Sequence, residues 1–167
     1  FEDREYFMSW VVDEINKAKN KADKKGMKFS IRINGTSDID PTLFKLNGKT
    51  LFEIFPDVQF YDYTKVAKRF RLLEKYSNYD LTYSFSGRNW NECQEILDNN
   101  RGRVAVVFEK SLPETYKGYK VVDGDAYDMR YVDDQGVIVG LKFKRVKNKI
   151  EKSNNAFIVA IDDINRK

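Results

Sequence analysis

The sequence predicts a single α/β domain whose mainly parallel sheet forms a partial or distorted (βα) barrel or stays open. A strand–turn–helix pattern repeats three times at intervals of about 25 residues, as parallel strands with crossover helices require. The length of 167 residues suits one domain, and no linker-like stretch divides it. We therefore expect one domain over 1–167, with an N-terminal helix at 3–25, βα repeats at 27–110 and a β-rich end at 111–167.

The first expected element is an amphipathic helix over residues 3–25. Its apolar side chains recur at helical spacing, at Phe7, Val11, Ile15, Ala18 and Ala22. Lysines occupy the other faces, and Gly26 follows as a residue that commonly ends a helix. The pattern predicts a helix with one face packed and the other in water.

Four strands and three short helices make up the expected βα repeats. Apolar alternation, or a continuous apolar run in the last case, predicts strands at residues 27–33, 58–61, 81–85 and 104–108. Helices are expected at residues 50–55, 66–76 and 89–97, the last with Asn89 as N-cap. Short crossovers predict that these strands are parallel neighbours in chain order, with the deepest burial along 104–108.

The last third of the chain no longer shows the alternation of strands and helices. Strands are expected at residues 119–122, 137–143 and 157–161, with little room for helices between them. The run Asp133-Asp134-Gln135-Gly136 is typical of a hairpin turn, and the lysine- and asparagine-rich stretch 144–155 of a mobile loop. These features predict a β-rich C-terminal part.

Composition excludes several kinds of chemistry. The chain has no histidine, which removes Ser-His-Asp and Cys-His catalysis and the common histidine metal sites. Its one cysteine, Cys93, excludes a disulfide framework and a thiolate zinc site. Cys93 falls on an apolar helical face, which favours core packing.

Charge and hydropathy limit the classes of partner that the protein can have. The chain carries 30 basic and 26 acidic residues, a formal net charge of +4, and has a pI near 9.0. That mild excess leaves nucleic-acid binding open without naming a site. The longest apolar runs fall far short of a membrane span, and a lone cysteine in a lysine-rich chain suits the host cytoplasm. The start at Phe1 rather than Met indicates a fragment or a processed product.

Polar side chains that follow the expected strands form the candidate ligand site. Parallel strands place their carboxyl ends at one edge of a sheet, so residues just beyond each strand should share a rim. The candidates are Asn34, Thr36, Asp38, Tyr63, Lys65, Ser84 and Ser86. An amide, a carboxylate, an ammonium and hydroxyls together favour a small polar or phosphorylated ligand. Each of these residue types is also common in turns and helix caps, so the set as a whole is stronger evidence for a site than any single residue.

A second candidate site lies in the acidic segment after residue 122. Asp123, Asp125 and Asp128 supply hard oxygen ligands at close spacing, which would suit magnesium or calcium. The spacing does not match an EF-hand loop, and such clusters are often only turns. The segment therefore predicts at most a metal-dependent activity as an alternative.

Five stretches of the sequence form a recognisable set. They are IRINGTSD at 31–38, FYDYTK at 60–65, NYDLTYS at 78–84, DGD at 123–125 with Asp128 and Arg130, and GVIVGLK at 136–142. Together they resemble the gene-product-88-like family of phage and mobile-element proteins. The resemblance implies a phage or plasmid origin and a barrel similar to radical-SAM barrels. Some relatives have a cysteine-rich N-terminal segment that would hold an iron–sulfur cluster, which Cys93 alone cannot do. No cofactor is therefore expected within this chain, unless such a segment precedes Phe1 or magnesium binds the acidic segment.

These observations leave three functions open, and they do not decide whether the protein is an enzyme. The first is an accessory protein, encoded by a phage or plasmid, with a polar ligand at the strand ends. The second is a binding or inhibitor module that acts on a host protein or nucleic acid. The third is a metal-dependent enzyme that uses the acidic segment.

The shared-rim hypothesis predicts the outcome of two substitutions. Asp38→Ala and Lys65→Ala should each abolish the protein's biological effect while leaving its melting temperature nearly unchanged, because both residues would act on a ligand. Activity assays beside thermal unfolding of both variants test this. Full activity in both variants would contradict it.

Overall fold

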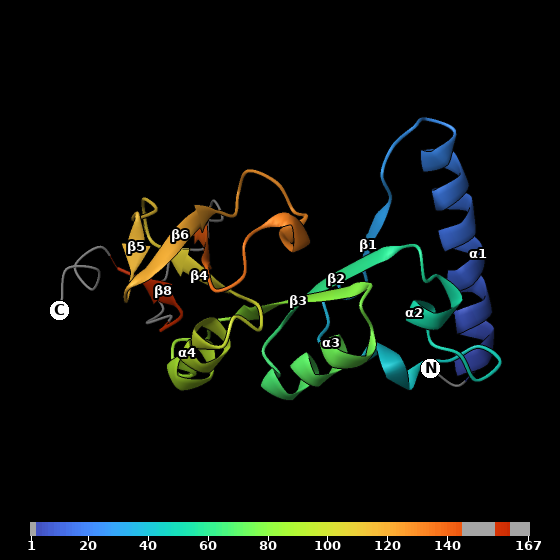
Figure 1. Ribbon diagram of the computed structural model, residues 1–167, viewed down its shortest axis with the longest axis horizontal. Helices are drawn as coiled ribbons and strands as arrows, with labels where there is room; N and C mark the ends of the chain where they lie inside the picture. Colours follow the sequence, from blue (N-terminus) through green and yellow to red (C-terminus); the bar gives the residue numbers. More distant parts are fainter. Residues whose placement is uncertain (1–2, 145–155, 161–167) are drawn as a thin grey trace, which may run out of the picture. The chain divides into compact units, whose positions relative to one another are not determined.

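Eight strands form one mostly parallel sheet in the computed structural model, which describes residues 3–144 and 156–160. The strand order is β1-β2-β3-β4-β7-β6-β5, and β8 pairs with β4 (Figure 1). The predicted strands at 27–110 are therefore neighbours in chain order, as expected. The order has two ends, β1 and β5, so the described sheet is open and the predicted barrel is not confirmed.

Backbone contacts divide the chain into two compact units. The first comprises Phe1–Asp62 and Arg71–Asp80, and the second comprises Tyr63–Phe70 and Leu81–Lys167. Each unit is described separately below.

The first unit contains a long helix, short helical turns and the start of the sheet. Its elements are α1 (Arg4–Asp23), β1 (Ser30–Arg32), η1 (Pro41–Leu43), α2 (Leu51–Ile54) and α3 (Leu72–Lys75). The first residues of β2 (Gln59–Thr64) and β3 (Tyr79–Ser84) also belong to it. β1 pairs parallel with β2, with Ile31 opposite Phe60. The core is aromatic, since Phe52 packs on the Phe60, Tyr76 and Tyr79 rings at centroid distances of 5.3, 4.8 and 4.5 Å.

Capping chemistry sets the helix ends in this unit. The Asp3 carboxylate accepts a hydrogen bond from the Tyr6 amide at 2.8 Å and so caps α1. Thr50 and Glu53 form a capping box around α2, which begins where the sequence predicts. The predicted helix at 66–76 instead divides into η2 (Ala67–Arg71) and α3.

Strand boundaries differ from the sequence prediction in two informative places. β1 covers Ser30–Arg32 rather than 27–33, because the Met27 amide still bonds the Ala22 carbonyl at the end of α1. β2 extends through Thr64 and so contains Asp62, which the sequence places in a turn. Asp62 remains in the strand because its buried carboxylate finds hydrogen-bond donors there.

The second unit is centred on β4 (Arg103–Phe108). β4 pairs parallel with β3, β7 (Ile138–Lys142) and β8 (Ile158–Val159), while α4 (Trp90–Asp98) precedes it. Val104, Val106 and Phe108 are each 0% exposed, as the continuous apolar run predicts. The β-rich end is confirmed, with a hairpin of β5 (Thr115–Tyr116) and β6 (Tyr119–Asp123) that the sequence did not predict in full. Most of the predicted loop at 144–155 and the end of the strand at 157–161 lie outside the described residues.

The predicted hairpin turn at 133–136 is wrong. β6 and β7 run parallel, with Val122 opposite Val139, so a crossover through η3 (Arg130–Val132) joins them. Two buried arginines hold this crossover. Arg103 donates through Nε to the Asp133 carbonyl at 2.9 Å, and Arg130 lies 3.2 Å from the Asp133 carboxylate. Asp133 therefore binds two arginines within a crossover connection and is not part of a hairpin turn.

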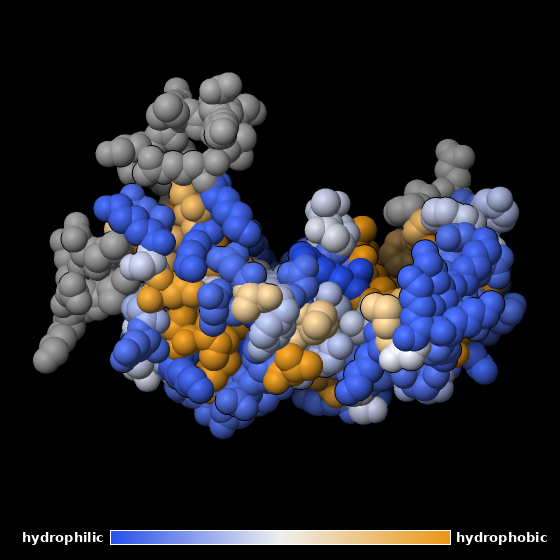
Figure 2. Space-filling view, turned by 90° about the horizontal axis from the view of Figure 1, so that it is seen from above, coloured by the Kyte–Doolittle hydropathy of each residue, from blue (hydrophilic) through white to orange (hydrophobic). Residues whose placement is uncertain are grey.

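None of the helices in the described ranges is long and apolar enough to cross a bilayer. Hydrophilic residues instead cover the α1 region at the right of Figure 2. The exposed lysines Lys17, Lys21, Lys24 and Lys25 lie on this helix and its end.

Candidate functional site

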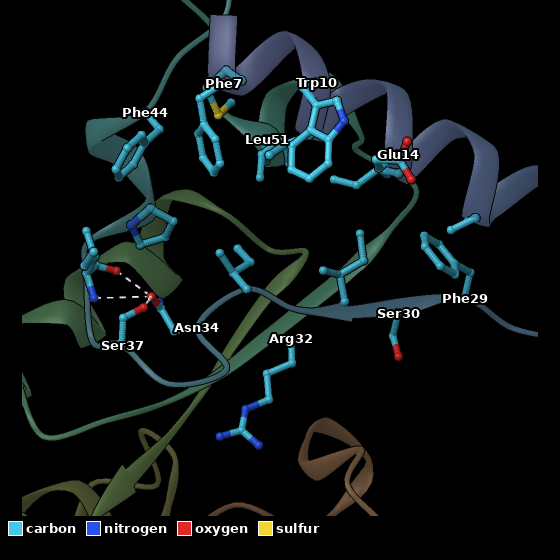
Figure 3. Close-up of a pocket in the computed structure, with 18 residues that line it drawn as sticks. Phe7, Trp10, Glu14, Phe29, Ser30, Arg32, Asn34, Ser37, Phe44 and Leu51 are labelled. Carbon is cyan, nitrogen blue, oxygen red and sulfur yellow. Dashed lines mark hydrogen bonds between the residues drawn. The ribbon is translucent and has the colours of Figure 1, made fainter. Parts of the chain in front are cut away.

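A groove lies between α1 and β1 in the first unit. Its volume is about 560 Å³, within the range of ligand pockets. One wall comes from α1, the floor comes from β1 and its flanks, and the loop from Asn34 to Leu51 closes one end (Figure 3). Its lining comprises Phe7, Met8, Trp10, Val11, Glu14, Ile15, Ala18, Phe29, Ser30, Ile31, Arg32, Ile33, Asn34, Ser37, Ile39, Pro41, Phe44 and Leu51.

The helical wall is the apolar face that the sequence predicts for α1. Phe7, Val11 and Ala18 line the groove, but Ala18 is exposed and the other two are only half-buried. Trp10 also lines it and remains 58% exposed. A single exposed aromatic residue is ordinary, but Trp10 adjoins Phe7 and other lining residues that are only partly buried, so a contiguous apolar stretch of this face of α1 is incompletely covered.

The floor follows from the two-residue repeat of a strand. Ser30 and Arg32 point away from α1, while Phe29 points toward the helix side in Figure 3. Ile31 and Ile33 line the groove with Phe29. The alternation therefore gives the groove an apolar floor.

Aromatic packing closes the end of the groove near the start of α1. The Phe7 ring meets the Phe44 ring edge-on at 6.0 Å between centroids. The Arg4 guanidinium lies 5.8 Å from the centroid of the Phe44 ring. Glu14, the acidic residue of the lining, is paired with Lys17 at 2.7 Å. Arg4 is thus a cation beside the aromatic end of the groove, where the neighbouring Asp3 and Glu5 carboxylates accept from the Tyr6 and Asn47 amides, and the Glu14 charge beside the middle of the helical wall is paired.

A buried polar network fixes the loop that closes this end. The Asp62 carboxylate, in a residue 1% exposed, accepts hydrogen bonds from the Asn34 amide at 2.7 Å and its Nδ2 at 2.8 Å. The Tyr79 hydroxyl donates to the same carboxylate at 2.9 Å. The Asn34 Oδ1 in turn accepts from the Ser37 hydroxyl at 2.7 Å and the Ile39 amide at 3.3 Å. This network ties the exit of β1 to β2 and shapes the loop around Asn34.

Asn34 is the only predicted ligand residue that lines the groove described above, and its role differs from the prediction. Its side chain is engaged on both the oxygen and the nitrogen by protein groups. It therefore positions the loop rather than presenting a free amide. The sequence signal that would have revealed this is Asp62, a carboxylate within a strand-like run.

The other predicted ligand residues are distributed over both units. Thr36 and Asp38 are exposed in the loop of the first unit. In the second unit Lys65 is exposed, and Tyr63, Ser84 and Ser86 are half-buried. The Ser86 amide donates to the Asn89 side chain at 2.7 Å, and that side chain donates to the Ser84 carbonyl at 3.1 Å. Asn89 is the N-cap residue of α4, as predicted, but its side chain orders this turn and makes no capping hydrogen bond. Their arrangement as one rim stays a prediction.

The acidic segment is held by its own chain. The Asp125 carboxylate accepts from the Lys142 amide at 2.9 Å and pairs with Lys144 at 3.0 Å. The hydrogen bond from the Lys142 amide lowers the pKa of the Asp125 carboxyl, with Lys144 adding to the effect. Asp123 accepts from the Asp125 amide at 2.9 Å in a turn. In residues 3–144 and 156–160, no group of three or more acidic or cysteine side chains is placed to hold a metal ion.

Cys93 packs in the core of the second unit. Its side chain is 0% exposed, and burial raises the pKa of the thiol to about 12. A thiol of that pKa stays protonated near neutral pH, whereas cluster ligation needs the thiolate. The prediction that Cys93 is core packing is confirmed.

The fold and the groove define an α/β protein with an open sheet and an apolar cavity at its first strand. A family model described as Gene product 88 matches residues 1–159, so the chain belongs to the Gene product 88 family, a family of phage gene products. No curated protein and no solved structure matches the chain. The family match confirms the resemblance of the sequence, and the radical-SAM-like barrel is not supported.

The network around Asp62 generates a stability prediction. Asp62→Asn places an amide donor against the donors of Asn34 and Tyr79, and should lower the free energy of unfolding by about 2–3 kcal/mol. Tyr79→Phe removes one donor and should cost about 1 kcal/mol. Urea titration of both variants measures these losses. An Asp62→Asn variant as stable as the wild type would show that the network does not hold the loop.

Proposed function

We propose that this phage-family protein is a binding module and that the groove between α1 and β1 is its binding site. The observation that carries the proposal is an apolar cavity of about 560 Å³ with a 58% exposed Trp10 beside it. Exposed apolar surface of this kind costs solubility unless a ligand or partner covers it. Covering it releases water from both walls, which is the main favourable contribution to apolar association.

The chemistry of the lining supports an apolar occupant. Aliphatic and aromatic side chains contribute from both α1 and β1, and the charge of Glu14 is neutralised by Lys17. The polar groups of the Asn34 loop bond to one another. A host macromolecule with an apolar segment fits this site better than a small phosphorylated ligand does. The host cytoplasm is the setting that the reduced lone cysteine favours.

A small polar ligand at the strand ends is the competing proposal. Its support within the first unit is the exposure of Asp38 after β1. It is weaker than the groove proposal because the Asn34 amide is already engaged by Asp62, Ser37 and Ile39.

Binding of a neutral apolar dye tests the groove. N-phenyl-1-naphthylamine should bind the wild type with enhanced fluorescence and quench or shift the emission of Trp10 in a Trp90→Phe background. Val11→Glu, which puts a carboxylate at a half-buried position of the lining, should weaken dye binding by about tenfold because the charge loses part of its hydration when the dye binds.

Asn16→Glu is the matched control for the dye experiment. It adds the same charge to an exposed position of α1 that does not line the groove. It should leave dye affinity unchanged. Equal affinities of the wild type and Val11→Glu, or no dye binding at all, would overturn the proposed function.

A further inference from the structure

We propose that the occupant of the groove is an extended segment of a partner protein, which adds as a strand to the outer edge of β1. This inference rests on the proposed function and names its ligand: an apolar segment of about six residues with acidic residues at its ends. Addition of a strand to a sheet edge supplies main-chain hydrogen bonds, and the groove supplies pockets for alternate side chains.

β1 is the terminal strand of the sheet order. It pairs with β2, and no strand pairs with its other side in the part of the chain that the structure describes. It is also short, since only Ser30–Arg32 pair although the apolar alternation of the sequence spans 27–33. A strand added at this edge would pair with Ser30–Arg32 and with the residues before them as far as Lys28, since the Met27 amide is held by the Ala22 carbonyl.

The register identifies which backbone groups face that edge. The Phe60 amide donates to the Asn78 carbonyl at 2.8 Å, so Phe60 turns its backbone polar groups away from β1. In a parallel pair the residue opposite such a position bonds the neighbouring strand, and this residue is Ile31. The next residue along a strand faces the other way, so Ser30 directs its N–H and C=O to the outer edge.

The size of the groove limits the segment. The lining includes a continuous run from Phe29 to Asn34, which an extended chain covers over about 20 Å. Side chains that alternate toward the groove would meet Phe7, Val11 and Phe44. Valine and isoleucine suit these positions because β-branched residues favour extended backbone.

Charge complementarity sets the ends of the segment. Arg4 lies beside Phe44 near one end of the groove, and the exposed Lys28 precedes Phe29 at the other. Acidic residues at both ends of the segment would therefore meet cations. A second copy of β1 fits poorly, because antiparallel pairing about Ser30 would place Lys28 of one copy opposite Arg32 of the other.

The experiment uses a fluorescein-labelled peptide with four alternating valine and isoleucine residues between two glutamates. The wild type should bind it, and the same peptide with N-methylated alternate amides should bind at least about tenfold more weakly because it lacks edge donors. Lys28→Glu should also weaken binding, more strongly at low salt. Equal affinities for the two peptides would overturn the inference.

Variants at Ser30 separate the edge from the groove. Ser30→Pro removes the N–H that faces the edge, spares the Ile31 bonds to β2, and should weaken peptide binding by about tenfold. Ser30→Ala, the matched control, keeps the N–H and should bind as the wild type does. Loss of peptide binding in Ser30→Pro with binding retained in Ser30→Ala therefore tests the backbone N–H of the edge. The N-methylated peptide gives the same test on the wild type if Ser30→Pro does not fold.

Two other occupants are outcomes that would overturn the inference. Binding of palmitate with no binding of the peptide would identify a lipid site, and dye binding would then still support the proposed function. Concentration-dependent dimerisation in light scattering that Lys28→Glu strengthens would identify a second copy. Loss of dye binding in the wild type would instead contradict the proposed function itself.

Discussion

The buried carboxylate of Asp62 is the constraint on which the first unit depends. It lies inside β2, where a charged group is costly unless donors surround it. Donors from Asn34 and Tyr79 meet that need, and hydrogen bonds to a charged acceptor are among the stronger ones in proteins. The need to satisfy this one carboxylate therefore links the exit of β1, the middle of β2 and the start of β3.

The groove is a consequence of that link. Once Asn34 is fixed on Asp62, its oxygen orders Ser37 and Ile39, and this loop closes one end of the cavity. α1 then lies over a strand that, among the residues the structure describes, pairs on one side only. The described residues do not cover the whole apolar face of α1, and Trp10 on this helix remains exposed. The groove therefore combines a loop whose buried polar groups are hydrogen-bonded with an apolar helix face that is only partly buried.

Sequence reasoning predicted the elements whose signals are local. The α1 helix, the short helix predicted at 50–55 and the buried strand β4 all lie where their local patterns place them. Sequence reasoning failed where the local structure depends on residues that are distant in the sequence. Asp133 and its neighbours look like a hairpin turn, but two buried arginines bind them in a crossover between parallel strands. Asp62 looks like a turn residue for the same reason, because its partners lie 28 and 17 positions away.

The candidate site was predictable only in part. Asn34 was identified, but as a ligand group rather than as the support of a loop. The apolar faces of α1 and β1 were also identified, but as core. Nothing in a periodic pattern distinguishes a buried face from one that awaits a partner, because both need the same residues. The distinction requires the strand order and the exposed fraction of Trp10.

Amide hydrogen exchange at single residues tests the central claim most directly. In ¹⁵N-labelled protein, the Ser30 amide should exchange fast alone and become protected when the glutamate-flanked peptide is added. The Ile31 amide, which bonds β2, should be protected in both conditions. Unchanged exchange at Ser30 with the peptide bound, or protection that appears away from β1 and α1, would contradict the account.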